Sequence, residues 1–155
     1  MCGISGVHST KKSAEKLTSI AINMSKAIIH RGPDDNGVWI DKNYNLALSH
    51  RRLSIIDTSN GGHQPMSSQC SRYTIVFNGE IYNYQSLRKK IENFKSNIKW
   101  QGGSDTEVLL EALSAWGLSS TLKNVEGMFA FALWDSVDGK LFLARDRFGE
   151  KPLYY

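Results

Sequence analysis

Apolar residues recur at helical spacing in two long stretches of the chain. Residues 11–29 carry apolar side chains three or four positions apart, which places them on one face of a helix. Residues 104–117 give the clearest helical pattern. Ser104 and Glu107 have the spacing of a capping box, and Gly117 is typical of a helix end. The hydrophobic pattern therefore predicts an amphipathic helix in each stretch.

Short runs of apolar and β-branched residues predict strands elsewhere. The predicted strands are residues 2–8, 37–41, 45–57, 73–79 and 98–101, with a further helix near residues 83–94. Residues 127–146 predict a hairpin that turns at Asp138-Gly139. Its strands are apolar on both faces, so we expect them to be covered above and below. Antiparallel strands with two or three amphipathic helices predict an α+β fold, although periodicity alone leaves several packings open.

Composition narrows the class of protein. The 155 residues fit one domain, and 41% hydrophobic and 22% charged residues are ordinary for a globular protein. The net charge is +4, and its tightest basic cluster, residues 88–90, is interpreted as a solvated helix face. We expect no nucleic-acid partner, because no recognition motif accompanies that cluster. No apolar run could span a bilayer and no signal peptide is visible, so we expect no membrane association and a cytoplasmic location.

Cysteines and histidines limit the cofactor chemistry. The two cysteines, Cys2 and Cys70, lack the paired spacing of a disulfide framework or a zinc site. The four histidines lack metal-ligand spacing, and no glycine-rich phosphate loop is present. We therefore expect neither a metal nor a nucleotide in this chain. Cys70 is interpreted as a bystander in a polar loop.

Cys2 is a candidate nucleophile because of its position. Removal of Met1 would leave a thiol and a free α-amine on the same residue. An α-amine with a pKa of roughly 7.7–8.0 is partly neutral near pH 7–8, so it could accept the proton of a thiol whose pKa is about 8.5. The alternative is that Cys2 is a small hydrophobic residue near the start of a buried strand.

Three other positions could bind a charged or polarised substrate. Asn78 and Gly79 follow a strand and could offer an amide and a backbone N–H to an oxyanion, or simply form a turn. Arg51 and Arg52 could hold a carboxylate or lie on the surface. Asp105, in the first turn of a helix, could bind an ammonium group or complement the helix dipole.

Seven motifs occur in an order that resembles one family. They are MCGI at 1–4, HRGPDDNG at 30–37, RRLSIID at 51–57, NGEIYN at 78–83, GSDTEV at 103–108, GMFAFALWD at 127–135 and RDRFGEKPLYY at 145–155. Together they resemble the class II glutamine amidotransferases, and within these the glutamine-hydrolysing asparagine synthetases. MCGI alone is shared with other class II enzymes, whereas the combination resembles the asparagine synthetase type.

The resemblance implies a fold, a reaction and a role for each candidate residue. The fold is the N-terminal-nucleophile hydrolase αββα sandwich of two antiparallel sheets, and the reaction is hydrolysis of L-glutamine to L-glutamate and ammonia. Cys2 would be the nucleophile, and its α-amine would be the base. The implied oxyanion hole is Asn78 with Gly79, and the implied glutamine-binding residues are Arg52 for the α-carboxylate, Glu80 and Asp105 for the α-ammonium, and the backbone of Leu53, Ser54, Ile55 and Ile56. Arg51 receives no role.

The resemblance also implies parts beyond residue 155. Related enzymes continue with further strands and with a synthetase domain that uses ATP, Mg and aspartate, so we expect residues 1–155 to form an incomplete glutaminase domain. The expected partners are L-glutamine, a separate or missing synthetase domain, and a second copy in a homodimer. Two alternatives remain open: a catalytically silent module that binds glutamine or a partner, and an amidotransferase half for another acceptor, such as a surface-sugar or antibiotic precursor.

Overall fold

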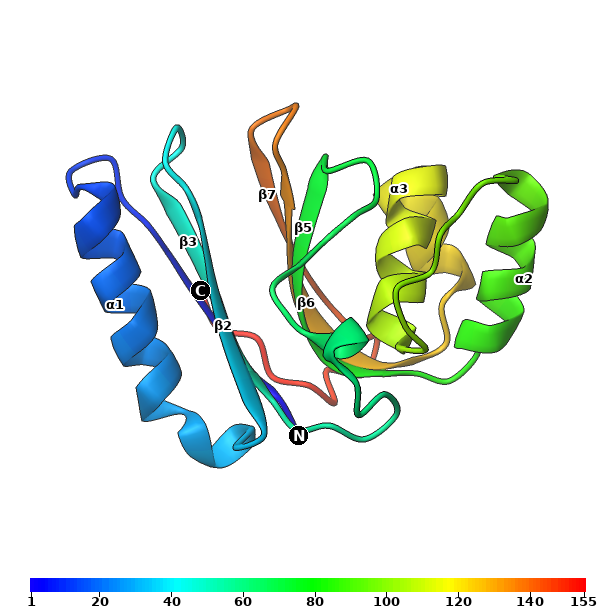
Figure 1. The fold of residues 1–155 in the computed structure, drawn as a ribbon, viewed down its shortest axis with the longest axis horizontal. Coiled ribbons are helices and arrows are strands. Elements are labelled where there is room, and N and C mark those ends of the chain that lie inside the picture. The colour runs from blue at the N-terminus through cyan, green and yellow to red at the C-terminus, as the bar shows by residue number, and fades with distance from the viewer.

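The computed structural model describes residues 1–155 as four layers in the order helix, sheet, sheet, helices (Figure 1). The elements are β1 (Gly3–His8), α1 (Ala14–Ala27), β2 (Asp35–Asp41), β3 (Leu46–Arg52), β4 (Met66–Ser67), β5 (Tyr73–Ile81), α2 (Tyr84–Phe94), α3 (Asp105–Asn124), β6 (Gly127–Asp135) and β7 (Lys140–Arg145). All the strand pairs are antiparallel. The predicted αββα sandwich is therefore confirmed. No helix is both long enough and apolar enough to cross a membrane.

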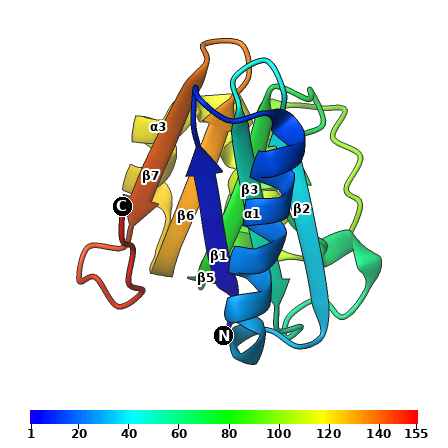
Figure 2. The ribbon, with the colours of Figure 1, turned by 90° about the vertical axis from the view of Figure 1, so that its left-hand side faces the viewer.

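The smaller sheet has the strand order β1-β3-β2 and carries α1 on its outer face (Figure 2). Leu17 and Ala21 of α1 pack against Ala47 of β3, and all three side chains are fully buried. Ser13 caps the helix by accepting a hydrogen bond from the Lys16 N–H. This apolar contact explains why residues 11–29 have a helical hydrophobic pattern.

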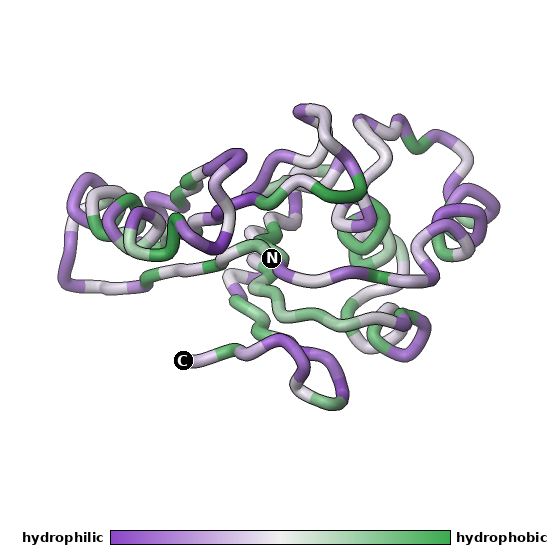
Figure 3. Tube along the Cα trace, turned by 90° about the horizontal axis from the view of Figure 1, so that it is seen from below, coloured by the Kyte–Doolittle hydropathy of each residue, from purple (hydrophilic) through white to green (hydrophobic).

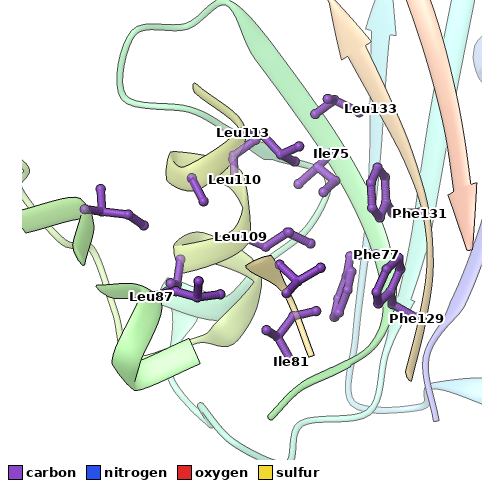
Figure 4. Close-up of a cluster of buried hydrophobic side chains, with 14 residues drawn as sticks. Ile75, Phe77, Ile81, Leu87, Leu109, Leu110, Leu113, Phe129, Phe131 and Leu133 are labelled. Carbon is purple, nitrogen blue, oxygen red and sulfur yellow. The ribbon is translucent and has the colours of Figure 1, made fainter. Parts of the chain in front are cut away.

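The larger sheet has the order β4-β5-β6-β7 and is covered by α2 and α3. A cluster of 14 buried residues fills the space between this sheet and the two helices (Figure 4). It includes Phe77 and Phe131 from the strands and Leu87 and Leu109 from the helices. Figure 3 shows that hydrophobic residues gather along the central strands and that hydrophilic ones prevail in the outer loops.

The two sheets face each other across a smaller apolar layer. Five buried residues form it: Leu46, Leu48, Val76, Ala132 and Trp134. The layer fills only part of the space between the sheets, because β3 and β5 both continue beyond it with polar residues. Four of the active-site candidates, Arg52, Asn78, Gly79 and Glu80, lie on these continuations.

The structure corrects two of the predicted strands and one helix end. The strand predicted over 45–57 ends at Arg52, and residues 98–101 form no strand. The helix predicted to end at Gly117 resumes beyond it and ends at Asn124. Gly117 interrupts it with a φ of 75° and a ψ of 169°, an extended backbone conformation of positive φ that glycine adopts without a steric cost.

The hairpin prediction is only partly confirmed. Gly139 takes the positive φ that the turn requires, and β6 is buried along most of its length. β7, however, is the edge strand of its sheet, and Leu141 and Leu143 are 39% and 43% exposed. The expected cover on both faces is therefore wrong for β7, since these two leucines lie outside the apolar layer between the sheets.

Candidate active site

A pocket between the two sheets collects the predicted site residues. All of them line it except Ser54, whose backbone N–H donates instead to Asp34 Oδ2 at 2.8 Å. The predicted residues at the pocket are Cys2, Arg52, Leu53, Ile55, Ile56, Asn78, Gly79, Glu80 and Asp105. Residues from four separate parts of the sequence therefore meet at one end of the sandwich.

Strand alternation decides which of the two adjacent arginines reaches the pocket. Leu48 belongs to the layer between the sheets, so Arg52, four positions later on β3, points to the same face. Arg51 points to the opposite face, where its Nε donates to the Ser25 carbonyl of α1 at 3.1 Å. The structure therefore separates a pocket arginine from an arginine that packs against a helix.

The same alternation on β5 directs two polar side chains toward the pocket. Val76 belongs to the layer between the sheets, so Asn78 and Glu80 follow on that face. Asn78 is 5% exposed, and its Oδ1 is buried without a hydrogen-bond partner. His50 of β3 bridges the sheets through Nε2 to the Phe77 carbonyl at 3.0 Å, and burial lowers the pKa of His50 to about 4. His50 is thus a neutral structural link beside the pocket.

The backbone of β5 presents an N–H group at Gly79. Phe77 N–H donates to Gln64 Oε1 at 2.7 Å, and Ile81 N–H donates to Asp105 Oδ2 at 2.9 Å. Alternate N–H groups of a strand point to the same edge, so the Gly79 N–H lies between these two and points the same way. β4 pairs only with Ile75 and Thr74, so it does not reach Gly79.

The partner strand confirms this direction for the Gly79 backbone. Gly79 is opposite Phe129 of β6, whose N–H and carbonyl both bond to Asp146, at 3.1 and 2.8 Å. Since Phe129 uses both backbone groups on its other side, Gly79 has no ladder bond with it. A Cβ on Gly79 would collide with the Met128 carbonyl, which explains why glycine is needed here.

Arg52 is a buried cation with no anionic partner. Its guanidinium donates to the backbone carbonyls of Asp57 and Ser59, the latter at 2.8 Å, and the residue is 7% exposed. No carboxylate lies within the 4.0 Å of an ion pair. A Cβ on Gly62 would collide with this guanidinium, so the loop after β3 fits closely around it. The remaining N–H groups can bind a carboxylate in the bidentate manner.

Asp105 is the complementary case, a buried carboxylate without a cation. It begins α3, directly after the capping residue Ser104, and is 6% exposed. Burial raises the pKa of Asp105 despite the backbone N–H groups of Ile81 and Thr106, and nearby Glu80 raises it further. A ligand ammonium group at this position would offset the free-energy cost of burying the ionised carboxylate, since it would pair with it.

Cys2 lies beside the first residue after β3. Its Sγ accepts a hydrogen bond from the Leu53 N–H at 3.4 Å. Burial raises the pKa of the Cys2 thiol and outweighs that bond and the positive charges of the N-terminus and Arg52. The resting side chain is therefore a neutral thiol, which needs a base before it can attack. The Leu53 N–H that makes this bond comes directly after Arg52, the last residue of β3.

Sequence reasoning missed several pocket residues. Gln64 and Lys151 are buried, at 4% exposure each, and neither has a local pattern that marks it as functional. The other missed residues are Met1, Asp57, Gly62, Phe77, Ser104, Thr106 and Met128. Several of them lie within the motifs quoted above. Membership of a motif is the only feature of the sequence that could have identified them as pocket residues. Cys70 does not line the pocket, and no group of three His, Cys, Asp or Glu residues could hold a metal ion.

Known proteins are similar to this chain over nearly its whole length. Residues 1–155 match the family described as glutamine amidotransferase domain. Asparagine synthetase [glutamine-hydrolyzing] 1 of Bacillus subtilis is 44% identical over 100% of this chain and 24% of its own length. Asparagine synthetase B [glutamine-hydrolyzing] of Escherichia coli is 41% identical over 99% of this chain and 26% of its own length.

The fold also has a relative of known structure. Glutamine phosphoribosylpyrophosphate amidotransferase of B. subtilis superposes with a TM-score of 0.68 at 20% identity, covering 94% of this chain and 36% of the other. That similarity concerns the fold alone. The chain spans about a quarter of the length of the two asparagine synthetases above. The family match over every residue nevertheless shows that the chain belongs to the glutamine amidotransferases, as a glutamine amidotransferase domain.

Proposed function

We propose that this domain hydrolyses L-glutamine to L-glutamate and ammonia with Cys2 as the nucleophile. One observation carries the proposal: a buried guanidinium without an anion and a buried carboxylate without a cation line the same pocket as a cysteine at the second position. An α-amino acid carries a carboxylate and an ammonium on one carbon. Glutamine adds a side-chain amide that can extend from these groups to the thiol.

Substrate recognition follows from the unpaired charges. Arg52 binds the α-carboxylate through the N–H groups that the loop carbonyls leave free, and Asp105 with Glu80 binds the α-ammonium. The pocket disfavours analogues without either α-group, because a buried charge would then stay unpaired. Glutamine is thereby oriented before its amide meets the sulfur.

The chemical steps use the residue that becomes first once Met1 is removed. The Cys2 α-amine accepts the thiol proton while the sulfur attacks the amide carbon of glutamine, and the carbonyl oxygen becomes an oxyanion. The Asn78 amide and the Gly79 N–H donate to that oxyanion. The protonated α-amine of Cys2 then gives its proton to the departing nitrogen of the substrate amide. Ammonia leaves, and Cys2 and the substrate are joined as a thioester. Water, deprotonated by the same amine, cleaves the thioester to glutamate and restores the thiol.

The ammonia is proposed to serve a synthetase partner. The relatives quoted above are named glutamine-hydrolysing asparagine synthetases, so the proposed overall reaction of a complete protein is amide transfer to aspartate. ATP and Mg would be bound by that partner rather than by residues 1–155. A cytoplasmic location and a homodimer remain predictions.

The proposed reaction is tested by labelling with an electrophilic glutamine analogue. The intact mass is measured before and after treatment, and the modified peptide is mapped. We expect loss of Met1 and one adduct on Cys2, and excess glutamine should block the adduct. The Cys70→Ala variant is the matched control and should label equally.

Two outcomes would contradict the proposed reaction. An adduct on Cys70 would mean that the pocket thiol is not the reactive one. A processed chain that takes no adduct and releases no ammonia, yet binds glutamine by calorimetry, would favour a silent binding module instead.

A further inference from the structure

Lys151 is a buried cation at the pocket that the proposed reaction does not use. The residue is 4% exposed and lines the pocket together with Met1 and Cys2. Its Nζ donates to the Met1 sulfur at 2.7 Å, and no carboxylate lies within the 4.0 Å of an ion pair. A thioether is a weak acceptor, so this ammonium is poorly compensated for its burial.

The segment that carries Lys151 is firmly held. Asp146 accepts hydrogen bonds from the backbone N–H groups of Phe129, Phe148, Glu150 and Lys151, at 2.9 to 3.1 Å. Burial opposes the ionisation of Asp146, but these donors outweigh it and lower its pKa, so the carboxylate stays ionised. Because Asp146 fixes both the start of β6 and residues 146–151, Lys151 has a defined position at the pocket.

Removal of Met1 changes the surroundings of this ammonium. The thioether belongs to the residue directly bonded to the Cys2 nitrogen, so its loss takes away the partner of Lys151 and creates an α-amine at the same pocket. In unfolded peptides an α-amine releases its proton at lower pH than a lysine side chain does. A lysine cation close by makes the protonated α-amine less favourable still.

We propose that Lys151 is a positioning residue that keeps the α-amine of processed Cys2 neutral, and so able to accept the thiol proton. This inference rests on the proposed function, because only that reaction needs the amine as a base. The neighbouring charges do not supply the same effect. Arg52 is the only other pocket cation, and it is already assigned to the substrate carboxylate. The anions Asp57, Glu80 and Asp105 would favour the protonated amine.

The pH profile of glutamine hydrolysis tests the inference. In Lys151→Met, we expect the acid limb of kcat/KM to move upward by about one pH unit, with KM at high pH unchanged. Lys151→Arg keeps the charge and should retain the wild-type profile, and Lys151→Gln should behave like Lys151→Met. An unchanged profile in both neutral variants would overturn the inference. So would a raised KM without a shift, because Lys151 would then bind glutamine itself.

A second measurement separates this inference from the proposed function. Acetylation of the α-amine is followed against pH in the Cys2→Ala background, with the processed terminus confirmed by mass, so that no thiol or turnover is involved. Adding Lys151→Met should raise the midpoint for amine labelling by about one pH unit. An unmoved midpoint refutes the role of Lys151 even if hydrolysis is demonstrated. A moved midpoint without any hydrolysis refutes the proposed function but not the electrostatic effect.

Discussion

The two faces of β5 serve different purposes. The face toward α2 and α3 carries Ile75, Phe77 and Ile81, which join the apolar cluster of 14 residues. The face toward the smaller sheet begins with Val76 in the apolar layer and continues with Asn78 and Glu80 at the pocket. One strand therefore belongs to a dry core on one side and to a polar site on the other.

The difference shows where the fold accepts a cost in stability. The helix-facing core buries apolar groups, which favours folding in proportion to their area. The pocket instead buries the Asn78 oxygen without a hydrogen-bond partner, and the Arg52 guanidinium and the Asp105 carboxylate without an oppositely charged partner. Such groups are costly in the empty state and become favourable when a ligand pairs with them. The two regions should respond to mutation in opposite ways.

The largest expected effect is loss of activity at the pocket. Cys2→Ala should lower the rate of glutamine hydrolysis by more than about a thousandfold, because it removes the nucleophile. The midpoint of thermal unfolding should stay close to that of the wild type, since the change deletes a single sulfur atom. Ammonia release and circular dichroism are the measurements. Residual hydrolysis near the wild-type rate would exclude Cys2 as the nucleophile.

The next effect belongs to the core. Leu109 is fully buried in α3. Leu109→Ala should therefore lower the free energy of unfolding by about 2–5 kcal/mol. The matched control is Leu143→Ala on β7, which should cost much less because that side chain is 43% exposed. Urea unfolding measures both. Equal costs would contradict the assignment of β7 as an exposed edge.

A smaller effect should separate the adjacent arginines. Arg52→Lys should raise KM for glutamine about tenfold, because a single ammonium cannot replace the two-pronged contact with a carboxylate. Arg51→Lys is the control. It loses the bond to the Ser25 carbonyl and should reduce stability without changing KM. Steady-state kinetics of both variants measure KM. A rise in KM for Arg51→Lys alone would show that Arg51, and not Arg52, binds the carboxylate of glutamine.

The smallest expected effect is a gain in stability, in contrast to the loss expected for the core variant. Asp105→Asn should weaken glutamine binding but raise the unfolding free energy at pH 7 by about 1 kcal/mol, as is common when a strained functional group is neutralised. Because burial raises the pKa of Asp105, the folded state binds this proton more tightly than the unfolded state. The stability linked to this proton is complete below the ordinary aspartate pKa and is lost as the pH rises through the raised value.

The pH dependence provides the check on Asp105. The stability difference between Asp105→Asn and the wild type should shrink as the pH falls from 7 to below the ordinary aspartate pKa. Thermal unfolding across this range measures it. A variant that is less stable than the wild type at pH 7 would show that the Asp105 carboxylate stabilises the fold through its bond to the Ile81 N–H.

The sequence alone predicted the main elements and most of the candidate site. Helical spacing placed Leu17 and Ala21 on the buried face of α1, and the capping box placed Ser104 at the start of α3. These signals are local, because they depend on residues within a few positions of one another. The motifs named Cys2, Arg52, Asn78 and Asp105, and the structure brings all four to one pocket.

Tertiary contacts decided the remaining features. The pattern of residues 53–57 is as apolar as a strand, but the chain leaves the sheet after Arg52, and the Leu53 N–H donates to the Cys2 sulfur 51 positions earlier. Leu141 and Leu143 belong to a continuous apolar run of the kind found in a strand covered on both faces, but their position at a sheet edge leaves them exposed. Lys151 is buried because Asp146 fixes its backbone against β6. Hydrophobic periodicity depends on residues close together in the sequence, so it predicts local helices and strands. Burial, strand pairing and charge at the pocket depend on segments that meet only after folding.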